Sequence, residues 1–172
     1  MAGAWIDHGA TPPAIRALEL GHVVLDPAGP RCRCGHRGCL EAHASTTALA
    51  GILGVGEPAL LEAGDGWASR FPRGPAEREA LRHALEGLGL VLGNALNLLP
   101  ARRVLVCGWP SLLPAAERAA VAGGLDRSLF GGLAASGVVL DFLPPALGSE
   151  PRGALAWATH CFIEAGGIAP QP

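Results

Sequence analysis

Three cysteines and one histidine near the start of the chain have the types and spacing of metal ligands. Cys32, Cys34 and Cys39 lie within eight residues, and His22 stands ten residues before the first of them. Three thiolates and one imidazole make up the donor set of a closed structural zinc site. The two glycines between Cys34 and Cys39 can adopt the positive φ angles that let a short knuckle bring its sulfurs to one point. We therefore predict a structural zinc site.

Other interpretations of this cluster stay open on spacing alone. His36 and His43 compete with His22 as the fourth ligand, and the thiols would otherwise remain reduced in a glycine-rich loop or form one disulfide. A disulfide is disfavoured because no secretory signal is recognisable, which makes the cytoplasm the expected compartment. Cys107, at the end of an apolar strand, and Cys161, in the last predicted helix, are interpreted as small buried hydrophobic residues.

Two carboxylates flank the cluster. Glu19 stands three residues before His22, and Glu41 stands two residues after Cys39. If zinc draws the two flanks together, both carboxylates would face one cavity, where the second nitrogen of a metal-bound His22 also needs a hydrogen-bond partner. Such groups suit a ligand with many hydroxyls, such as a sugar. The alternative is that Glu41 only sits in the first turn of the following helix, where the helix dipole favours it.

The elements that position these residues are read from hydrophobic spacing. Short extended pieces at residues 4–6 and 23–25, separated by turn residues, indicate a hairpin-like start. The loop from Asp26 to Cys39 has no regular period and would be ordered only if something holds it together. Helical spacing then appears at 40–53, weakly at 59–63, and strongly at 76–99, where leucines recur every three or four residues before Pro100.

The second half of the chain alternates strands and helices. We predict strands at 103–108 and 138–143, and helices at about 112–129 and at 151–165. This order implies an α/β layer with parallel crossovers. Because no internal repeat and no linker is evident, residues 1–172 are predicted to form a single α/β domain.

Composition excludes several classes of function. With 49% hydrophobic and 16% charged residues, the 172-residue chain is globular rather than disordered. All thirteen basic residues are arginine, so mechanisms that need a phosphate-loop or Schiff-base lysine are excluded. The net charge of −2, with dispersed arginines, leaves no electrostatic footprint for nucleic acid. The longest uncharged stretches, 42–56 and 87–101, are shorter than the ~20 apolar residues of a spanning helix, so we expect no membrane partner.

The segment around the cysteines resembles a known family signature. Glu19-Leu-Gly-His22 is followed by Asp26-Pro-Ala-Gly-Pro30, and then by a run from Cys32 to Ser45 that reads CRCGHRGCLEAHAS. This pattern resembles the signature of the ROK family, which combines bacterial sugar kinases with sugar-responsive transcriptional repressors. The match is specific, because it fixes a histidine, three cysteines, two glutamates and several glycines at set spacings.

The resemblance implies a fold and two sites. In that family, a structural zinc is bound by the counterparts of His22, Cys32, Cys34 and Cys39. The hydroxyls of a hexose or N-acetylhexosamine are contacted by the counterparts of Glu19, His22 and Glu41. The zinc and sugar segment would then be 19–45. Residues 77–165 look like the C-terminal part of the family's actin-like ATPase fold, which is ribonuclease H-like. The resemblance thus implies the C-terminal part of that fold, with a zinc-stapled loop.

The chain departs from the family kinases at the nucleotide side. We expect it to lack both the N-terminal ATP-binding lobe and a DNA-binding domain. The letters from Asp7 to Thr11 fit the phosphate loop Asp-x-Gly-x-Thr, but the two prolines that follow cannot continue as a central strand, so the fit is interpreted as a coincidence. Gly108-Trp109 replaces the paired glycines usual near the family's adenine site.

These departures predict that the chain alone is not a competent kinase, because phosphoryl transfer needs a base, phosphate donors and a metal together. No catalytic residue is assigned, and ATP with Mg²⁺ would bind only if another lobe completed the site. The leading hypothesis is the effector-sensing half of a sugar-responsive transcriptional regulator. The alternatives are the C-terminal half of a glucokinase-like enzyme, or a zinc-stapled scaffold without ligand.

A missing first lobe also predicts a homo-oligomer or another partner that covers the exposed face.

Overall fold

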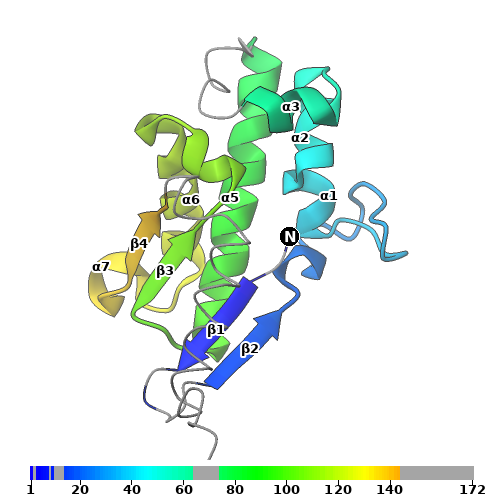
Figure 1. Ribbon diagram of the computed structural model, residues 1–172. Coiled ribbons are helices and arrows are strands. Elements are labelled where there is room, and N and C mark those ends of the chain that lie inside the picture. Colours follow the sequence, from blue (N-terminus) through cyan, green and yellow to red (C-terminus); the bar gives the residue numbers. More distant parts are fainter. Residues whose placement is uncertain (2, 8, 10–13, 64–73, 144–172) are drawn as a thin grey trace, which may run out of the picture.

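The structure, a computed structural model, describes residues 1, 3–7, 9, 14–63 and 74–143, and of residues 61–63 only the backbone. Two small sheets and several shorter helices lie around one long helix (Figure 1). None of the helices in this part of the chain combines the length and apolar character needed to cross a bilayer. The predicted helix at 151–165, with Cys161, lies outside the described residues.

The chain starts with a β-hairpin. Strands β1 (Gly3–Asp7) and β2 (Ala14–Leu18) pair antiparallel, with Gly3 opposite Leu18 and Asp7 opposite Ala14. The hairpin-like start is confirmed, but its second strand was predicted too late, at 23–25. Those residues fold instead onto the cysteine loop, where the N–H of Leu25 donates to the carbonyl of Gly38 at 2.8 Å. Because that loop takes their hydrogen bonds, they form no strand of the hairpin.

The predicted helix at 40–53 is two helices, α1 (Leu40–Ala44) and α2 (Thr46–Leu53). Ser45 separates them in an extended conformation, with ψ 165°. Its hydroxyl oxygen accepts a hydrogen bond from the N–H of Ala48 at 3.1 Å, so it caps α2 as serine commonly does. The short helix α3 (Glu57–Ala63) follows.

Helix α5 (Pro75–Leu98) is the central element, and its bounds differ from the prediction by one residue at each end. Proline at its first position has the fixed φ angle that suits a helix start. From Leu81 to Leu92, the leucines that set its period pack into the main core together with residues of α1, α2 and α6. The largest fully buried side chains are Leu40, Leu49, Leu81, Leu85, Leu125, Val91, Val121 and Cys39.

The second half has the predicted parallel crossover. Strands β3 (Arg103–Val106) and β4 (Val139–Phe142) pair in parallel, with Arg103 opposite Val139. Between them lie η3 (Trp109–Leu112), α6 (Ala115–Ser128) and α7 (Gly132–Ser136). Helix α6 begins later than predicted because Pro114, at ψ 150°, holds the preceding backbone extended. The mixed α/β class is therefore confirmed.

Helices α5 and α6 approach so closely that glycine is required on both. A Cβ added to Gly89 would stand 2.1 Å from the carbonyl oxygen of Val121, and one added to Gly124 would stand 2.2 Å from that of Glu86. Both distances are far below van der Waals contact, so the two helix backbones meet where side chains are missing. This contact fixes α5, and with it the helices that carry the candidate site.

Candidate metal centre and ligand site

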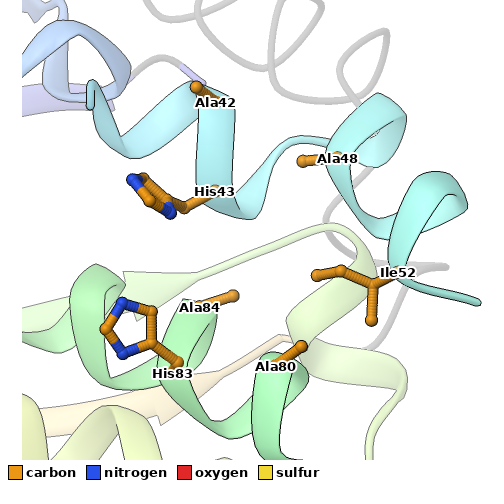
Figure 2. Close-up of a pocket in the computed structure, with 7 residues that line it drawn as sticks. All are labelled: Ala42, His43, Ala48, Ile52, Ala80, His83 and Ala84. Carbon is orange, nitrogen blue, oxygen red and sulfur yellow. The ribbon is translucent and has the colours of Figure 1, made fainter. Parts of the chain in front are cut away.

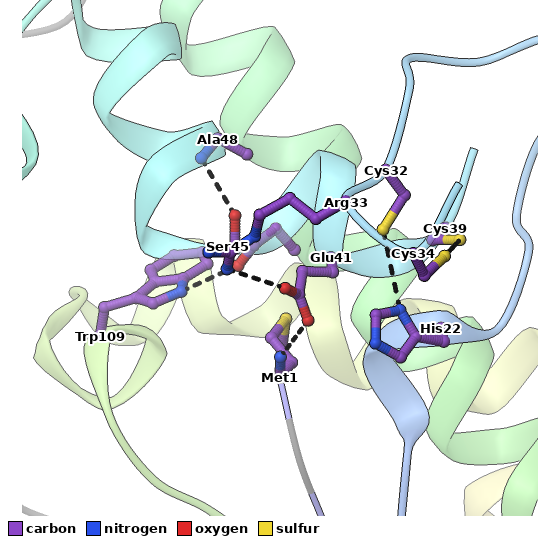
Figure 3. A network of polar contacts seen from close by, with 11 residues as sticks. Met1, His22, Cys32, Arg33, Cys34, Cys39, Glu41, Ser45, Ala48 and Trp109 are labelled. Carbon is purple, nitrogen blue, oxygen red and sulfur yellow. Dashed lines mark hydrogen bonds and ion pairs between the residues drawn. The ribbon is translucent and has the colours of Figure 1, made fainter. Parts of the chain in front are cut away.

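The four predicted metal ligands converge at one point. His22 ends the 3-10 helix η1 (Leu20–His22), Cys32 and Cys34 lie in the loop that follows, and Cys39 is the residue before α1. One ligand atom from each lies within 4.8 Å of all the others. Cys32 and Cys39 are buried, whereas His22 and Cys34 are exposed. The four side chains come together beside the N-terminal end of α1, on the right of Figure 3.

The spacing of the ligand atoms fits a tetrahedral ion. The Sγ atoms of Cys34 and Cys39 are 3.6 Å apart, and Sγ of Cys32 is 3.7 Å from Nδ1 of His22. A tetrahedral zinc ion with ordinary bond lengths places two sulfurs about 3.8 Å apart, and a sulfur and a nitrogen about 3.6 Å apart. Both measured separations agree with the edges of such a tetrahedron. The residues therefore fit a zinc ion in number, type and geometry.

The loop backbone explains why the sulfurs meet. The N–H of Cys32 donates to the carbonyl of His36 at 2.9 Å, and the N–H of Gly38 donates to that of Pro30 at 2.8 Å. Gly35 has φ 95° and Gly38 φ 67°, as the sequence predicts for a knuckle. A Cβ on Gly38 would stand only 1.5 Å from the carbonyl oxygen of Asp26, so this position requires glycine.

The thiols of the cluster differ in acidity. Burial raises the pKa of Cys39 to about 12, and the neighbouring Cys34 and Cys32 add to this. A hydrogen bond from the backbone of His36 lowers the pKa of Cys34. Since metals bind the thiolate, an ion entering this cluster displaces a proton from Cys39 at neutral pH.

The other candidate ligands do not join the cluster. Nδ1 of His36 lies 3.5 Å from Sγ of Cys34, but His36 is not among the residues whose ligand atoms converge. His43, in α1, faces α5 instead. The prediction that Cys107 is buried is wrong, since its side chain is exposed. Strand β3 ends at Val106, two residues before the predicted end at 108, so Cys107 lies outside the strand.

Glu41 lies in the first turn of α1, and its carboxylate reaches across to η1. A Cβ added to Gly21 would stand 2.8 Å from Oε2 of Glu41, so glycine in the Glu19–His22 segment lets the carboxylate approach. Oε2 also accepts a hydrogen bond from the N-terminal ammonium of Met1 at 2.6 Å. This bond, followed by one from Arg33, lowers the pKa of Glu41.

The remaining predicted carboxylate, Glu19, is exposed at the residue before η1. Residues 19–22 and Glu41 thus lie on adjoining elements, as expected if the flanks of the cluster are drawn together. Sequence reasoning missed Arg33, whose guanidinium donates to Oε1 of Glu41 at 3.1 Å. The sequence offered one indication that Arg33 lies at the site, namely its position between Cys32 and Cys34.

Trp109 contacts the C-terminal end of α1, the helix that carries Glu41. Gly108, at φ 79°, turns the chain after β3, and the indole Nε1 of Trp109 donates to the backbone carbonyl of Ala44 at 3.0 Å (Figure 3). The indole also packs against the main core. This contact fastens η3 to the end of α1, the helix that carries Glu41.

Comparison with known proteins gives a consistent set of relatives. The sequence pattern of the ROK family matches residues 14–158. The chain is 32% identical to a kanosamine kinase of Amycolatopsis mediterranei over 83% of this chain and 46% of the relative. It is 28% identical to the N-acetylglucosamine repressor of Escherichia coli O157:H7 over 58% of this chain and 28% of the repressor.

A solved structure agrees with these relatives. The crystal structure of a ROK hexokinase from Thermus thermophilus matches with a TM-score of 0.62 and 28% identity, over 86% of this chain and 49% of the hexokinase. The chain thus spans about half the length of the kanosamine kinase and of this hexokinase.

Proposed function

The chain belongs to the ROK family, and from this we propose that it is a zinc-containing, sugar-binding domain, most like the effector-sensing half of a sugar-responsive transcriptional regulator. One observation carries the proposal: the carboxylate of Glu41 lies against η1 at Gly21, next to His22, which is itself part of the metal cluster. The carboxylate that we propose contacts the sugar and the loop that we propose binds the metal are thereby connected through one short segment.

Zinc is the metal that the donor set favours, with His22, Cys32, Cys34 and Cys39 as its ligands. Bound there, it would supply structure rather than reactivity, since four protein ligands leave no open position. The loop around it has little apolar surface, so the ion would offset the entropy of ordering these residues.

The sugar would be held by Glu19, His22 and Glu41. Carboxylate oxygens accept hydrogen bonds from hydroxyl groups, and the imidazole N–H that does not face the metal donates one. A hexose or an N-acetylhexosamine is the proposed ligand class. The names of the relatives support this class, since they include a hexokinase and an N-acetylglucosamine repressor.

The regulator assignment rests on Trp109. Gly108-Trp109 stands where the family resemblance implies paired glycines near the adenine site, and its indole packs on the core and is bonded to Ala44. The second candidate function is the C-terminal half of an ATP-dependent sugar kinase, inactive without a further lobe that helps to bind ATP and Mg²⁺. The match to a kanosamine kinase over 83% of the chain favours it.

Metal content tests the zinc site. The purified chain should carry one equivalent of zinc by elemental analysis, and Cys39→Ser should lose it. Cys107→Ser is the matched control, because Cys107 is exposed and outside the cluster. Equal zinc content in the two variants would contradict the assignment.

Calorimetric titration tests the sugar site. Zinc-loaded chain is titrated with glucose, N-acetylglucosamine and their 6-phosphates, and Glu41→Gln should weaken any saturable binding at least tenfold, while Glu57→Gln in α3 leaves it unchanged. Binding that survives Glu41→Gln would contradict the site. The same sugars with ATP and Mg²⁺ separate the two candidates, since phosphorylation by this chain would refute the regulator assignment.

A further inference from the structure

A pair of histidines outside the cysteine cluster lies between α1 and α5. His43 of α1 and His83 of α5 face each other beside a cavity of about 230 Å³ (Figure 2). Their ring centroids are 5.9 Å apart, and the ring planes cross at 68°. The rest of the cavity lining is apolar, formed by four alanines and Ile52. The two imidazoles are therefore the polar groups of an otherwise apolar recess.

The separation of the rings fits a shared metal ion. Two imidazoles that bind one ion through nitrogens at about 2.0–2.1 Å place their ring centroids roughly 5–6.5 Å apart. The measured 5.9 Å lies within this range. Figure 2 shows a ring nitrogen of each histidine turned toward the space between α1 and α5.

Neither nitrogen of His43 is taken by a hydrogen bond within the described part of the chain. Its Nε2 is buried without a partner and lies 3.1 Å from where a Cβ on Gly29 would stand, so this atom faces the cysteine loop. Nδ1 is thereby left for the side that faces His83. An ion between the two rings would therefore be bound through Nδ1 of His43.

The charges around the pair favour a cation. Asp26 acts electrostatically on His43 and favours a positive charge there. Glu79, one turn before His83 on α5, interacts electrostatically with His83, but its carboxylate is mainly paired with Arg82. Burial, followed by repulsion from His83, lowers the pKa of His43, so its imidazole is neutral at pH 7, the form that binds metals. An anion would find no arginine in the lining of this cavity.

We propose that His43 and His83 together bind one divalent transition-metal ion, of the class that prefers imidazole nitrogen, with water in the cavity completing its coordination. This site is separate from the four-ligand cluster and does not depend on sugar binding. A metal here would link α1, which carries Glu41, to the central helix α5.

Nickel is the probe, because imidazole binds it well and it is distinct from the zinc already loaded. The zinc-loaded chain is titrated with Ni²⁺ by calorimetry, while a zinc-sensitive dye reports any release of zinc. We expect one equivalent of Ni²⁺ to bind without zinc release, and its affinity to fall at least tenfold in His43→Gln and in His83→Gln.

His36→Gln is the control for an exposed histidine outside the pair. Because Nδ1 of His36 lies 3.5 Å from Sγ of Cys34, the zinc content of this variant is measured first and must equal that of the unmodified chain. It should bind Ni²⁺ as the unmodified chain does. His83 is itself exposed, so His83→Gln should fold normally, and Ni²⁺ should raise the melting temperature of the unmodified chain but not of this variant. No Ni²⁺ binding, binding only with zinc release, or binding that persists in both cavity variants would overturn the proposal.

Discussion

The indole Nε1 of Trp109 donates a hydrogen bond to the backbone carbonyl of Ala44 at 3.0 Å, across 65 residues of sequence. It joins the turn after β3 to the last residue of α1. The chain has a natural comparison, because Trp5 makes the same type of bond to the carbonyl of Pro100, at 3.3 Å and in an exposed position.

Shortening Trp109 should therefore destabilise the fold more than shortening Trp5. Trp109→Phe loses a partly buried hydrogen bond and should cost about 1 kcal/mol, and Trp109→Ala also loses packing and should cost about 3 kcal/mol. Trp5→Phe should change stability by less than about 0.5 kcal/mol. Urea unfolding of the zinc-loaded variants measures these differences, and equal effects of Trp5→Phe and Trp109→Phe would contradict the anchoring role of Trp109.

Two adjacent glycines of α6 should respond in opposite directions to alanine. Gly124→Ala forces a Cβ to 2.2 Å from the carbonyl oxygen of Glu86 and should destabilise the chain by about 2 kcal/mol. At Gly123 the nearest atom is the flexible guanidinium of Arg127, at 3.6 Å, so Gly123→Ala should stabilise the helix by about 0.5–1 kcal/mol. Thermal unfolding compares the two, and a stabilising Gly124→Ala would refute the close helix contact.

Chelation of the metal should unfold the cysteine loop and leave the helix pair intact. The loop at 26–39 depends on its ligands, whereas α5 and α6 are held by buried leucines and by their glycine contact. Hydrogen exchange read by mass spectrometry should show exchange at least tenfold faster in peptides covering 26–39, and unchanged protection in α5. Loss of protection throughout the chain would show instead that the metal holds the whole fold.

His43 should make the chain less stable in acid. Burial, followed by repulsion from His83, outweighs attraction by Asp26 and lowers its pKa in the folded state below the ordinary 6.5. The unfolded chain then binds more protons between the two values, so the stability of the folded state falls as the pH drops from 6.5 through the lowered pKa.

The matched measurement is the difference in melting temperature between the unmodified chain and His43→Gln, with metal loading held equal. As the pH falls below 6.5, the melting temperature of the unmodified chain should fall relative to that of His43→Gln. Above pH 7 the difference between the two melting temperatures should stay constant. A difference that does not change with pH would show that His43 titrates normally.

Strong periodicity made some of these elements predictable. The bounds of α5 were predicted within one residue, because leucines recur every three or four positions through its 24 residues. The parallel pairing of β3 with β4 followed from their order around a helix. Donor type and spacing predicted that the three cysteines bind a metal with one histidine, and the family resemblance selected His22, which does converge with them, over His36 and His43.

Features that depend on which of two hydrogen-bond partners a backbone group takes were not predictable from the sequence. The spacing of apolar residues continues through Ser45, but its hydroxyl caps α2 and ends α1. Residues 23–25 have the composition of a strand, yet the carbonyl of Val23 accepts from the N–H of Leu40, and the N–H of Leu25 donates to the carbonyl of Gly38. The contact between Arg33 and Glu41 exists only after the loop has folded, so no sequence period announces it.

The glycine contact between α5 and α6 also bears on how the chain acquires its structure. The two helices follow each other closely in the sequence, so bringing them together closes only a short loop, and such contacts form fast. We expect this pair to assemble first and without metal. Metal binding would then be a late folding step, after α5 and α6 have packed together. A newly synthesised chain without metal would therefore already be partly folded.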